Sequence, residues 1–149
     1  MRVKAGMRVK AGTRVEDVRV GRAALDAIVA HAREAAPAEC CGLLLGGEAG
    51  VVDAVRTRNI ADEPASRFVV DPKDHIDGRR DARRRGLEVV GFYHSHPHSP
   101  ASLSQTDRAE ASYPDHLYLI VSLAGAVPDV AMFRLVRGDL RRVSLMTVG

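Results

Sequence analysis

The feature that most restricts the fold is a short, unbroken apolar run at residues 40–45, closed by Gly46 and Gly47. An apolar run of this length without polar alternation indicates an interior β-strand that is covered on both faces. Before it, residues 23–36 place apolar side chains at helical spacing, and Pro37 ends that pattern. The chain therefore combines helices with a buried sheet.

The rest of the sequence continues to change between strand and helix patterns. A charged helix is predicted at residues 72–85, with Pro72 at a first helical position and Gly86 past its end. Strands interleaved with helices and joined late by hairpins predict an α/β fold, with a mixed, mainly antiparallel sheet flanked by two or three helices. The other predicted elements are strands at 15–20, 51–60, 67–70, 87–93, 116–123, 130–136 and 140–146, and a short helix at 104–112.

The length and composition of the chain exclude several classes of protein. With 149 residues, of which 46% are hydrophobic and 28% charged, the sequence fits one folded domain and neither a disordered chain nor a fibre. No stretch approaches the ~20 apolar residues of a membrane span, so we expect a soluble, cytoplasmic protein without a membrane partner. The adjacent Cys40 and Cys41 would point to opposite faces of a strand, which predicts buried free thiols and no disulfide.

The net charge of +3 is concentrated in a repeated N-terminal segment. The hexapeptide MRVKAG occurs twice in residues 1–12, and residues 1–14 carry a charge of +5. We expect residues 1–14 to form a mobile basic tail and residues 15–149, whose net charge is −2, to form the domain. An arginine run at residues 79–85 fits the exposed face of a helix that also carries acidic residues, so charge gives no support to nucleic-acid binding.

Three of the six histidines follow the strand predicted at residues 87–93. In extended backbone, His94 and His96 project to one face and Ser95 to the other, because side chains alternate with a period of two. Two neighbouring imidazoles can bind zinc, and a catalytic zinc site needs a third protein ligand and an open position for water. Asp107, in the first turn of the helix predicted at residues 104–112, is the candidate for that third ligand.

Two of the candidate residues also have a structural interpretation. The pattern S-x-x-D resembles a helix capping box, with Ser104 as the N-cap residue and Asp107 bonding back to it. Glu39 is the candidate proton acceptor for a metal-activated water, because it directly precedes the buried strand, where desolvation would raise its pKa. The alternative for Glu39 is a solvated loop residue after Pro37.

These residues follow one spaced pattern, which is Glu39, then His94-Ser95-His96, seven residues, Ser104, two residues and Asp107. It resembles the motif of the JAMM metalloprotease family, also called MPN-plus or Mov34/PAD-1 domains, in which an upstream Glu precedes H-x-H-x7-S-x-x-D. The segment at residues 38–46 is similar to the E-x-C-G-L-L-L-G start of small bacterial members. The resemblance covers the chain from about residue 16 to its C-terminus and implies a cytidine-deaminase-like JAMM/MPN fold.

The resemblance also implies a role for each motif residue. His94, His96 and Asp107 would bind one Zn²⁺ per chain, with water as the fourth ligand. Glu39 would act as the general base and then as the acid, and Ser104 would stabilise the oxyanion of the tetrahedral intermediate.

Family members cut peptide or isopeptide bonds after the C-terminal Gly-Gly of ubiquitin or ubiquitin-like proteins, and small bacterial members act on sulfur-carrier proteins. The resemblance therefore implies a ubiquitin-like or sulfur-carrier protein as the substrate, with release of a cysteine adduct or a short extension. Two alternatives stay open: a non-catalytic MPN-type scaffold, and a metal-dependent hydrolase with a DNA-repair-related role, which the arginine run at residues 79–85 keeps open. The oligomeric state is open as well, a homodimer included.

Overall fold

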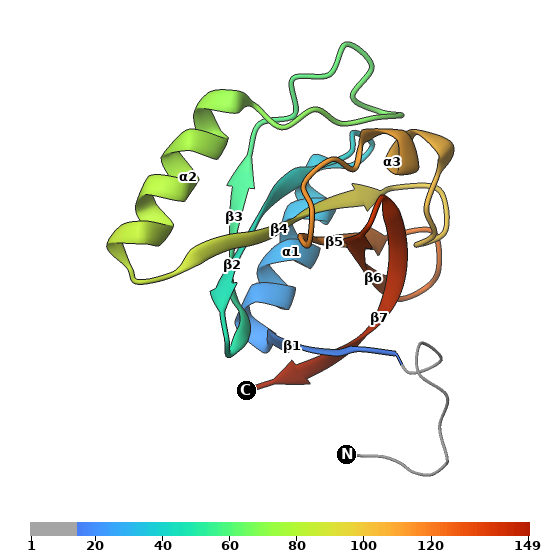
Figure 1. Cartoon of the computed structure of the whole chain (residues 1–149). Helices are drawn as coiled ribbons and strands as arrows, with labels where there is room; N and C mark the ends of the chain where they lie inside the picture. The colour runs from blue at the N-terminus through green and yellow to red at the C-terminus, as the bar shows by residue number, and fades with distance from the viewer. Residues whose placement is uncertain (1–14) are drawn as a thin grey trace, which may run out of the picture.

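The computed structural model describes residues 15–149, so the expected basic tail at residues 1–14 lies outside the described residues. The described part of the chain forms seven strands and three helices (Figure 1). In chain order the elements are β1 (Asp17–Gly21), α1 (Arg22–Ala35), β2 (Cys41–Gly47), β3 (Gly50–Thr57), α2 (Pro72–Arg84), β4 (Glu88–His96), α3 (Gln105–Glu110), β5 (Leu117–Ser122), β6 (Asp129–Val136) and β7 (Asp139–Val148).

The seven strands form a closed barrel in the order β1-β3-β2-β4-β5-β6-β7. β1 closes it by pairing in parallel with β7 along its whole length and with β3 at one register position, Val20 with Val51. β4 and β5 are also parallel, and the other neighbouring strands are antiparallel. The predicted α/β class and mixed sheet are confirmed. The expected arrangement, a sheet simply flanked by helices, is corrected to a barrel, because β1 meets a strand at the opposite end of the chain and no local pattern reports that pairing.

Two helices cover opposite faces of β2, and this explains its unbroken apolar run. Leu44 belongs to the main core, where Ile28 of α1 packs against the inner side of the curved sheet. Its neighbours Leu43 and Leu45 pack in a second cluster with Ala82 of α2, on the outer side (Figure 1). Side chains that alternate between two apolar layers leave no polar position in the strand.

The strand predicted at residues 67–70 does not form. Only Val70 pairs, in an isolated bridge with Asn59. The backbone of this segment bonds instead to the side chain of Asn59, which donates to the carbonyl of Arg67 and accepts from the amide of Val69. The other predicted elements are present, with boundaries that differ by at most three residues.

Two predictions from composition can be compared with the fold. Cys40 and Cys41 are buried free thiols, as predicted. Within residues 15–149, no helix has both the length and the apolar character needed to cross a membrane.

Candidate metal centre

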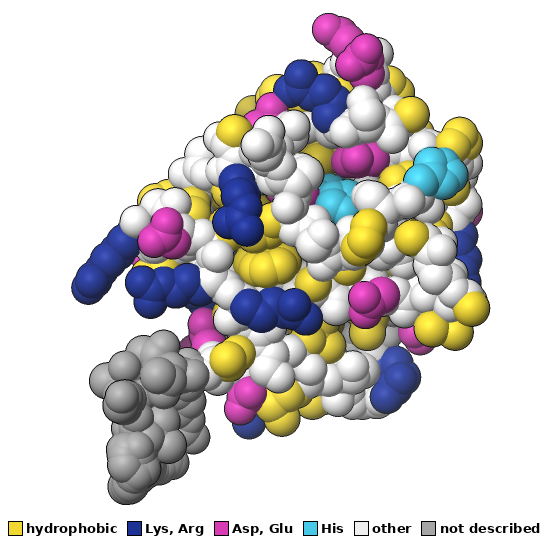
Figure 2. Space-filling model, turned by 90° about the vertical axis from the view of Figure 1, so that its right-hand side faces the viewer, with side chains coloured by type: hydrophobic (Ala, Val, Ile, Leu, Met, Phe, Trp, Pro, Cys, Tyr) yellow, Lys and Arg dark blue, Asp and Glu magenta, His cyan; other side chains and the backbone are white. Residues whose placement is uncertain are grey.

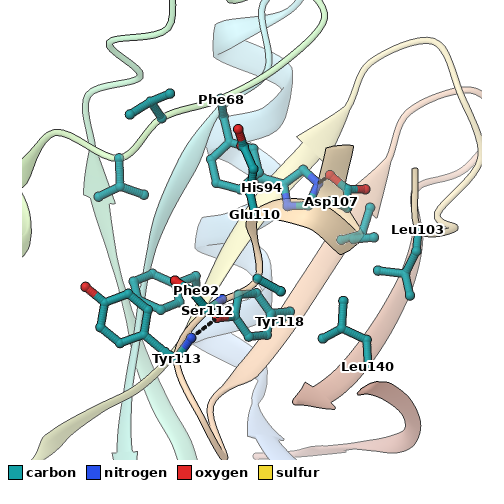
Figure 3. Close-up of a pocket in the computed structure, with 14 residues that line it drawn as sticks. Phe68, Phe92, His94, Leu103, Asp107, Glu110, Ser112, Tyr113, Tyr118 and Leu140 are labelled. Atoms are coloured by element: carbon teal, nitrogen blue, oxygen red, sulfur yellow. Dashed lines mark hydrogen bonds and ion pairs between the residues drawn. The ribbon is translucent and has the colours of Figure 1, made fainter. Parts of the chain in front are cut away.

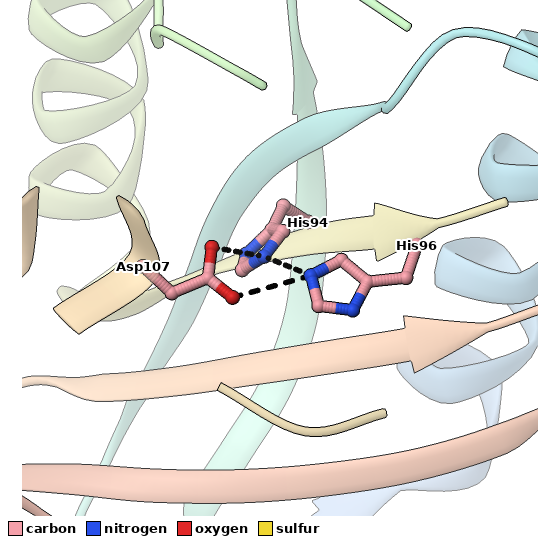
Figure 4. Close-up of side chains that lie close together, drawn as sticks. All are labelled: His94, His96 and Asp107. Atoms are coloured by element: carbon pink, nitrogen blue, oxygen red, sulfur yellow. Dashed lines mark hydrogen bonds and ion pairs between the residues drawn. The ribbon is translucent and has the colours of Figure 1, made fainter. Parts of the chain in front are cut away.

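β4 carries two histidines at its C-terminal end, and its pairing determines where they point. The strand lies between β2 and β5, with His94 opposite Cys41 on one side and Ile120 on the other. It runs through His96, three residues further than predicted, so both imidazoles project from one face. Their Nε2 atoms are 3.2 Å apart, and the side chains are only 5% and 6% exposed (Figure 4).

α3 brings the carboxylate of Asp107 to the two imidazoles (Figure 4). Its Oδ1 lies 3.0 Å from Nε2 of His94, and its Oδ2 lies 3.2 Å from Nε2 of His96. The same carboxylate closes a capping box, in which Oδ2 accepts from the amide of Ser104 and the Ser104 hydroxyl accepts from the amide of Asp107, both at 2.9 Å. The capping box is therefore present, and it fixes the carboxylate in the orientation that faces the histidines.

The three side chains form a group that fits a metal ion. One candidate ligand atom from each residue lies within 4.8 Å of the others. Two imidazole nitrogens and a carboxylate oxygen suit Zn²⁺, and three protein ligands leave a fourth position for water. Nδ1 of His96 donates to the carbonyl of Pro100 at 2.8 Å, so the neutral ring presents the lone pair of Nε2 to the metal position.

One aromatic contact holds His94 and has no signal in the motif. The ring of Phe68 stacks on the His94 imidazole, with centroids 4.3 Å apart and planes inclined by 22°. Phe68 comes from the segment for which the sequence predicted a strand, and the spacing of the histidines carries no information about it. Its ring covers one face of a metal-ligand candidate and restricts how that imidazole can turn.

Burial and hydrogen bonds set the ionisation of the three side chains. Burial lowers the pKa of His94, which favours the neutral ring that can bind a metal. Burial alone would raise the pKa of Asp107, but hydrogen bonds from His94 and His96 outweigh it and hold that pKa well below its usual range. For His96 burial acts against the charged form, but the hydrogen bonds to Asp107 and to the carbonyl of Pro100, together with the negative charge of Asp107, outweigh it and raise the pKa. An ionised carboxylate between two imidazoles therefore attracts positive charge to this position.

The backbone around Glu39 is held on both sides. The amide of Glu39 donates to the carbonyl of Pro64 at 2.7 Å, and its carbonyl accepts from Nδ2 of Asn59 at 3.0 Å. The next amide, that of Cys40, donates to the hydroxyl of Ser95 at 2.8 Å. Ser95 lies between the two histidines and points to the other side of β4, so it joins the start of β2 to the strand that carries the imidazoles.

The side chain of Glu39 is buried, with 8% of the residue exposed, which disagrees with the alternative of a solvated loop residue. Burial raises its pKa to about 7; the nearby His96 opposes this rise and the negative charge of Asp107 adds to it. A carboxyl group with such a pKa can both accept and donate a proton near neutral pH.

Two polar residues of the same region lie at the surface. Ser104 is exposed at the start of α3, and its hydroxyl keeps a proton to donate while its oxygen caps the helix. His98, which lies outside the spaced pattern, is exposed in the loop after β4 and is not a member of the group of possible metal ligands found among residues 15–149.

The comparison with known proteins agrees with this geometry. Residues 21–136 match the family described as prokaryotic homologs of the JAB domain. The chain belongs to this family. The resemblance to JAMM/MPN-plus proteins is thereby confirmed.

Two known proteins and one solved structure are similar to this JAB-domain protein. It is 43% identical over 108 residues to a desampylase of Haloferax volcanii, an alignment that covers 68% of this chain and 78% of that protein. It is 32% identical over 94 residues to a probable TtuB-protein conjugate cleaving protease of Thermus thermophilus, covering 63% of each chain. The crystal structure of AF2198, a JAB1/MPN domain protein from Archaeoglobus fulgidus, shares the fold with a TM-score of 0.59 at 19% identity and covers 89% of this chain and all of that one (100%).

An apolar groove of about 230 Å³ opens beside the metal-ligand group of the JAB-domain protein (Figure 3). His94 and Asp107 form part of its wall, together with the aromatic side chains Phe68, Phe92, Tyr113 and Tyr118 and the aliphatic side chains Leu103 and Leu140. On the face shown in Figure 2, histidine and acidic side chains likewise lie next to hydrophobic ones, with basic side chains around them. The groove therefore opens next to two of the three ligand candidates.

Proposed function

We propose that this JAB-domain protein is a zinc-dependent peptidase or isopeptidase that cleaves after the C-terminal Gly-Gly of a ubiquitin-like or sulfur-carrier protein. The observation that carries the proposal is the convergence of His94, His96 and Asp107, together with a buried Glu39 that is close enough to feel the charges of His96 and Asp107. The relatives named desampylase and TtuB-protein conjugate cleaving protease support a ubiquitin-like conjugate as the substrate. The product would be the carrier ending in glycine, with release of a cysteine adduct or a short extension in the cytoplasm.

The proposal assigns a role to each of the five site residues. His94, His96 and Asp107 would hold a single zinc ion, which would supply Lewis acidity and make a water molecule more acidic. Glu39 accepts a proton from the attacking water and later donates it to the leaving amine. Ser104 donates its hydroxyl proton toward the oxygen of the scissile carbonyl, where negative charge develops.

The shape of the site supports a narrow substrate tail. The groove beside His94 is apolar and lined by aromatic rings. The backbone of an extended peptide can lie in it, but the side chain of any residue larger than glycine must fit between these rings. A Gly-Gly tail meets no steric restriction close to the metal position. The rest of the carrier would remain outside the groove.

Two other functions receive less support from the structure. A non-catalytic scaffold has no need for a complete group of ligand candidates next to a buried acid. For a DNA-related role, part of the arginine run is already paired with acids: Arg84 and Arg85 contact Asp81, and Arg85 also contacts Asp53. This leaves less positive charge on α2 for phosphate groups.

The test is the intact mass of a Gly-Gly-ending carrier that bears a C-terminal extension or a cysteine adduct. It is incubated with the zinc-loaded protein, with Glu39→Ala and with the protein plus a chelator. We expect the mass to fall to that of the glycine-ending carrier only when zinc and Glu39 are both present. Cleavage by Glu39→Ala at the parental rate would refute the role of the base, and no cleavage by the zinc-loaded parent would refute the proposed reaction.

A further inference from the structure

The side chain of Asn59 makes four hydrogen bonds that meet at the site. Nδ2 donates to the carbonyls of Glu39, at 3.0 Å, and Arg67, at 3.1 Å. Oδ1 accepts from the amides of Ala61 and Val69, each at 3.0 Å. Two donors and two lone pairs are all that a carboxamide offers, so every hydrogen-bonding capacity of this side chain is used.

These bonds connect the two sides of the candidate active site. On one side, the bond to the carbonyl of Glu39 acts directly on the residue proposed as the base. On the other side, the bonds to Arg67 and Val69 hold the backbone on either side of Phe68, whose ring stacks on His94.

We propose that Asn59 is a positioning residue that sets the placement of Glu39 relative to the His94 ring. This inference rests on the proposed function, because Glu39 must reach a water molecule at the metal position. Asn59 lies on neither the strand nor the helix that carries the ligand candidates, so it acts on the base and on the ring stacked against a ligand, and not on the ligands' own backbone.

Chemistry restricts which side chain can take this place. Aspartate has the same shape but offers no donor, and its carboxylate would face the carbonyl oxygens of Glu39 and Arg67. Alanine removes all four bonds and leaves the segment at residues 67–70 with the single bridge at Val70 and its neighbouring backbone bonds. Asn59→Asp is the milder change. Because aspartate lacks the donor, this variant loses the two bonds to carbonyls but keeps the two acceptor bonds to the amides of Ala61 and Val69.

The test compares Asn59→Ala and Asn59→Asp with Ser66→Ala as the matched control. Ser66 lies in the same loop, and its hydroxyl bonds only within that loop, to the carbonyl of Glu63 at 3.3 Å. For each protein, kcat and KM for the carrier are measured per zinc-loaded chain, and zinc is counted by metal analysis. We expect both Asn59 variants to keep one zinc per chain and to lose at least about tenfold in kcat, and Ser66→Ala to match the parent.

A second readout does not depend on cleavage. Carboxyl carbon NMR of the chelator-treated protein follows the titration of Glu39, with the signal assigned by its loss in Glu39→Gln. Burial raises the pKa of Glu39 to about 7 in the parent. In the Asn59 variants the released carboxyl group should reach water, and its titration should move toward the ordinary value of 4.5.

The possible results separate the two proposals. If the parent does not cleave the carrier, the proposed function fails. The titration of Glu39 in the Asn59 variants then tests by itself whether Asn59 positions Glu39. An Asn59→Asp protein with kcat within twofold of the parent, or with an unmoved Glu39 titration, overturns the positioning role. Loss of zinc together with activity overturns it as well, since Asn59 would then support the ligands. If Asn59→Ala fails to fold, Asn59→Asp carries the test because it keeps two of the four bonds.

Discussion

Replacing Glu39 by glutamine should make the metal-free protein more stable, and the gain should grow with pH. Burial raises the pKa of Glu39 to about 7 from an ordinary value of 4.5. The folded protein therefore prefers the protonated acid, while the unfolded chain ionises more readily. The stability that goes with the protonated form is fully present below pH 4.5 and is lost as the pH rises through 7.

The size of the effect follows from the two pKa values. Ionisation of Glu39 costs the folded state about 1 kcal/mol at pH 5.5 and about 3 kcal/mol at pH 8.5, because each pKa unit corresponds to ~1.4 kcal/mol. Glutamine has the shape of the protonated acid and does not ionise. The advantage of Glu39→Gln over the parent should therefore increase by about 2 kcal/mol between these two pH values.

Urea denaturation of chelator-treated protein at pH 5.5 and 8.5 measures this difference. Glu34→Gln is the control: Glu34 is exposed, and its hydrogen bond to Arg56 lowers its pKa, so it stays ionised over the whole interval. The difference between Glu34→Gln and the parent should be the same at both pH values. If the difference in the free energy of unfolding between Glu39→Gln and the parent is also the same at pH 5.5 and 8.5, the reasoning that burial holds Glu39 in its protonated form is refuted.

Three further outcomes follow from the contacts around the metal-ligand group. Asp107→Ala should abolish zinc binding, measured by metal analysis, because it removes the carboxylate that faces both imidazoles. Ser104→Ala should keep zinc but lower the free energy of unfolding in urea by about 1 kcal/mol, since the N-cap bond to the Asp107 amide is lost. Phe68→Ala should leave all three ligands in place and weaken zinc affinity by about tenfold in competition with a chelating dye, because the ring that holds His94 is gone. A Phe68→Ala protein with parental affinity would show that the stacking does not orient the ligand.

The sequence predicted those parts of the molecule that depend on neighbouring residues. The run at residues 40–45 indicated a strand covered on both faces, and the structure covers Leu44 with α1 and Leu43 with α2. The period of two placed His94 and His96 on one face, and the S-x-x-D spacing gave a capping box that is present. In each case the information lies within one element or one turn.

The parts that were not predictable depend on contacts between distant segments. Barrel closure needs β1 to pair with β7, and nothing in either strand specifies the other. The segment at residues 67–70 has the composition of a strand, but Asn59 satisfies its backbone groups, so it stays a loop. For the same reason the stacking of Phe68 on His94 could not be read from the spacing of the histidines.

The arrangement of Asp107 shows how a local structural rule can serve a metal site. In a capping box the carboxylate usually serves only the helix, because its oxygens accept hydrogen bonds from the backbone amides at the helix start. Here only Oδ2 accepts from the amide of Ser104, while Oδ1 faces His94 alone. The cap therefore removes the freedom of the side chain and leaves an oxygen for a cation, which lowers the entropy that metal binding must overcome. Together with Nδ1 of His96 held by Pro100, it makes a group whose ligand atoms are already oriented before any metal arrives.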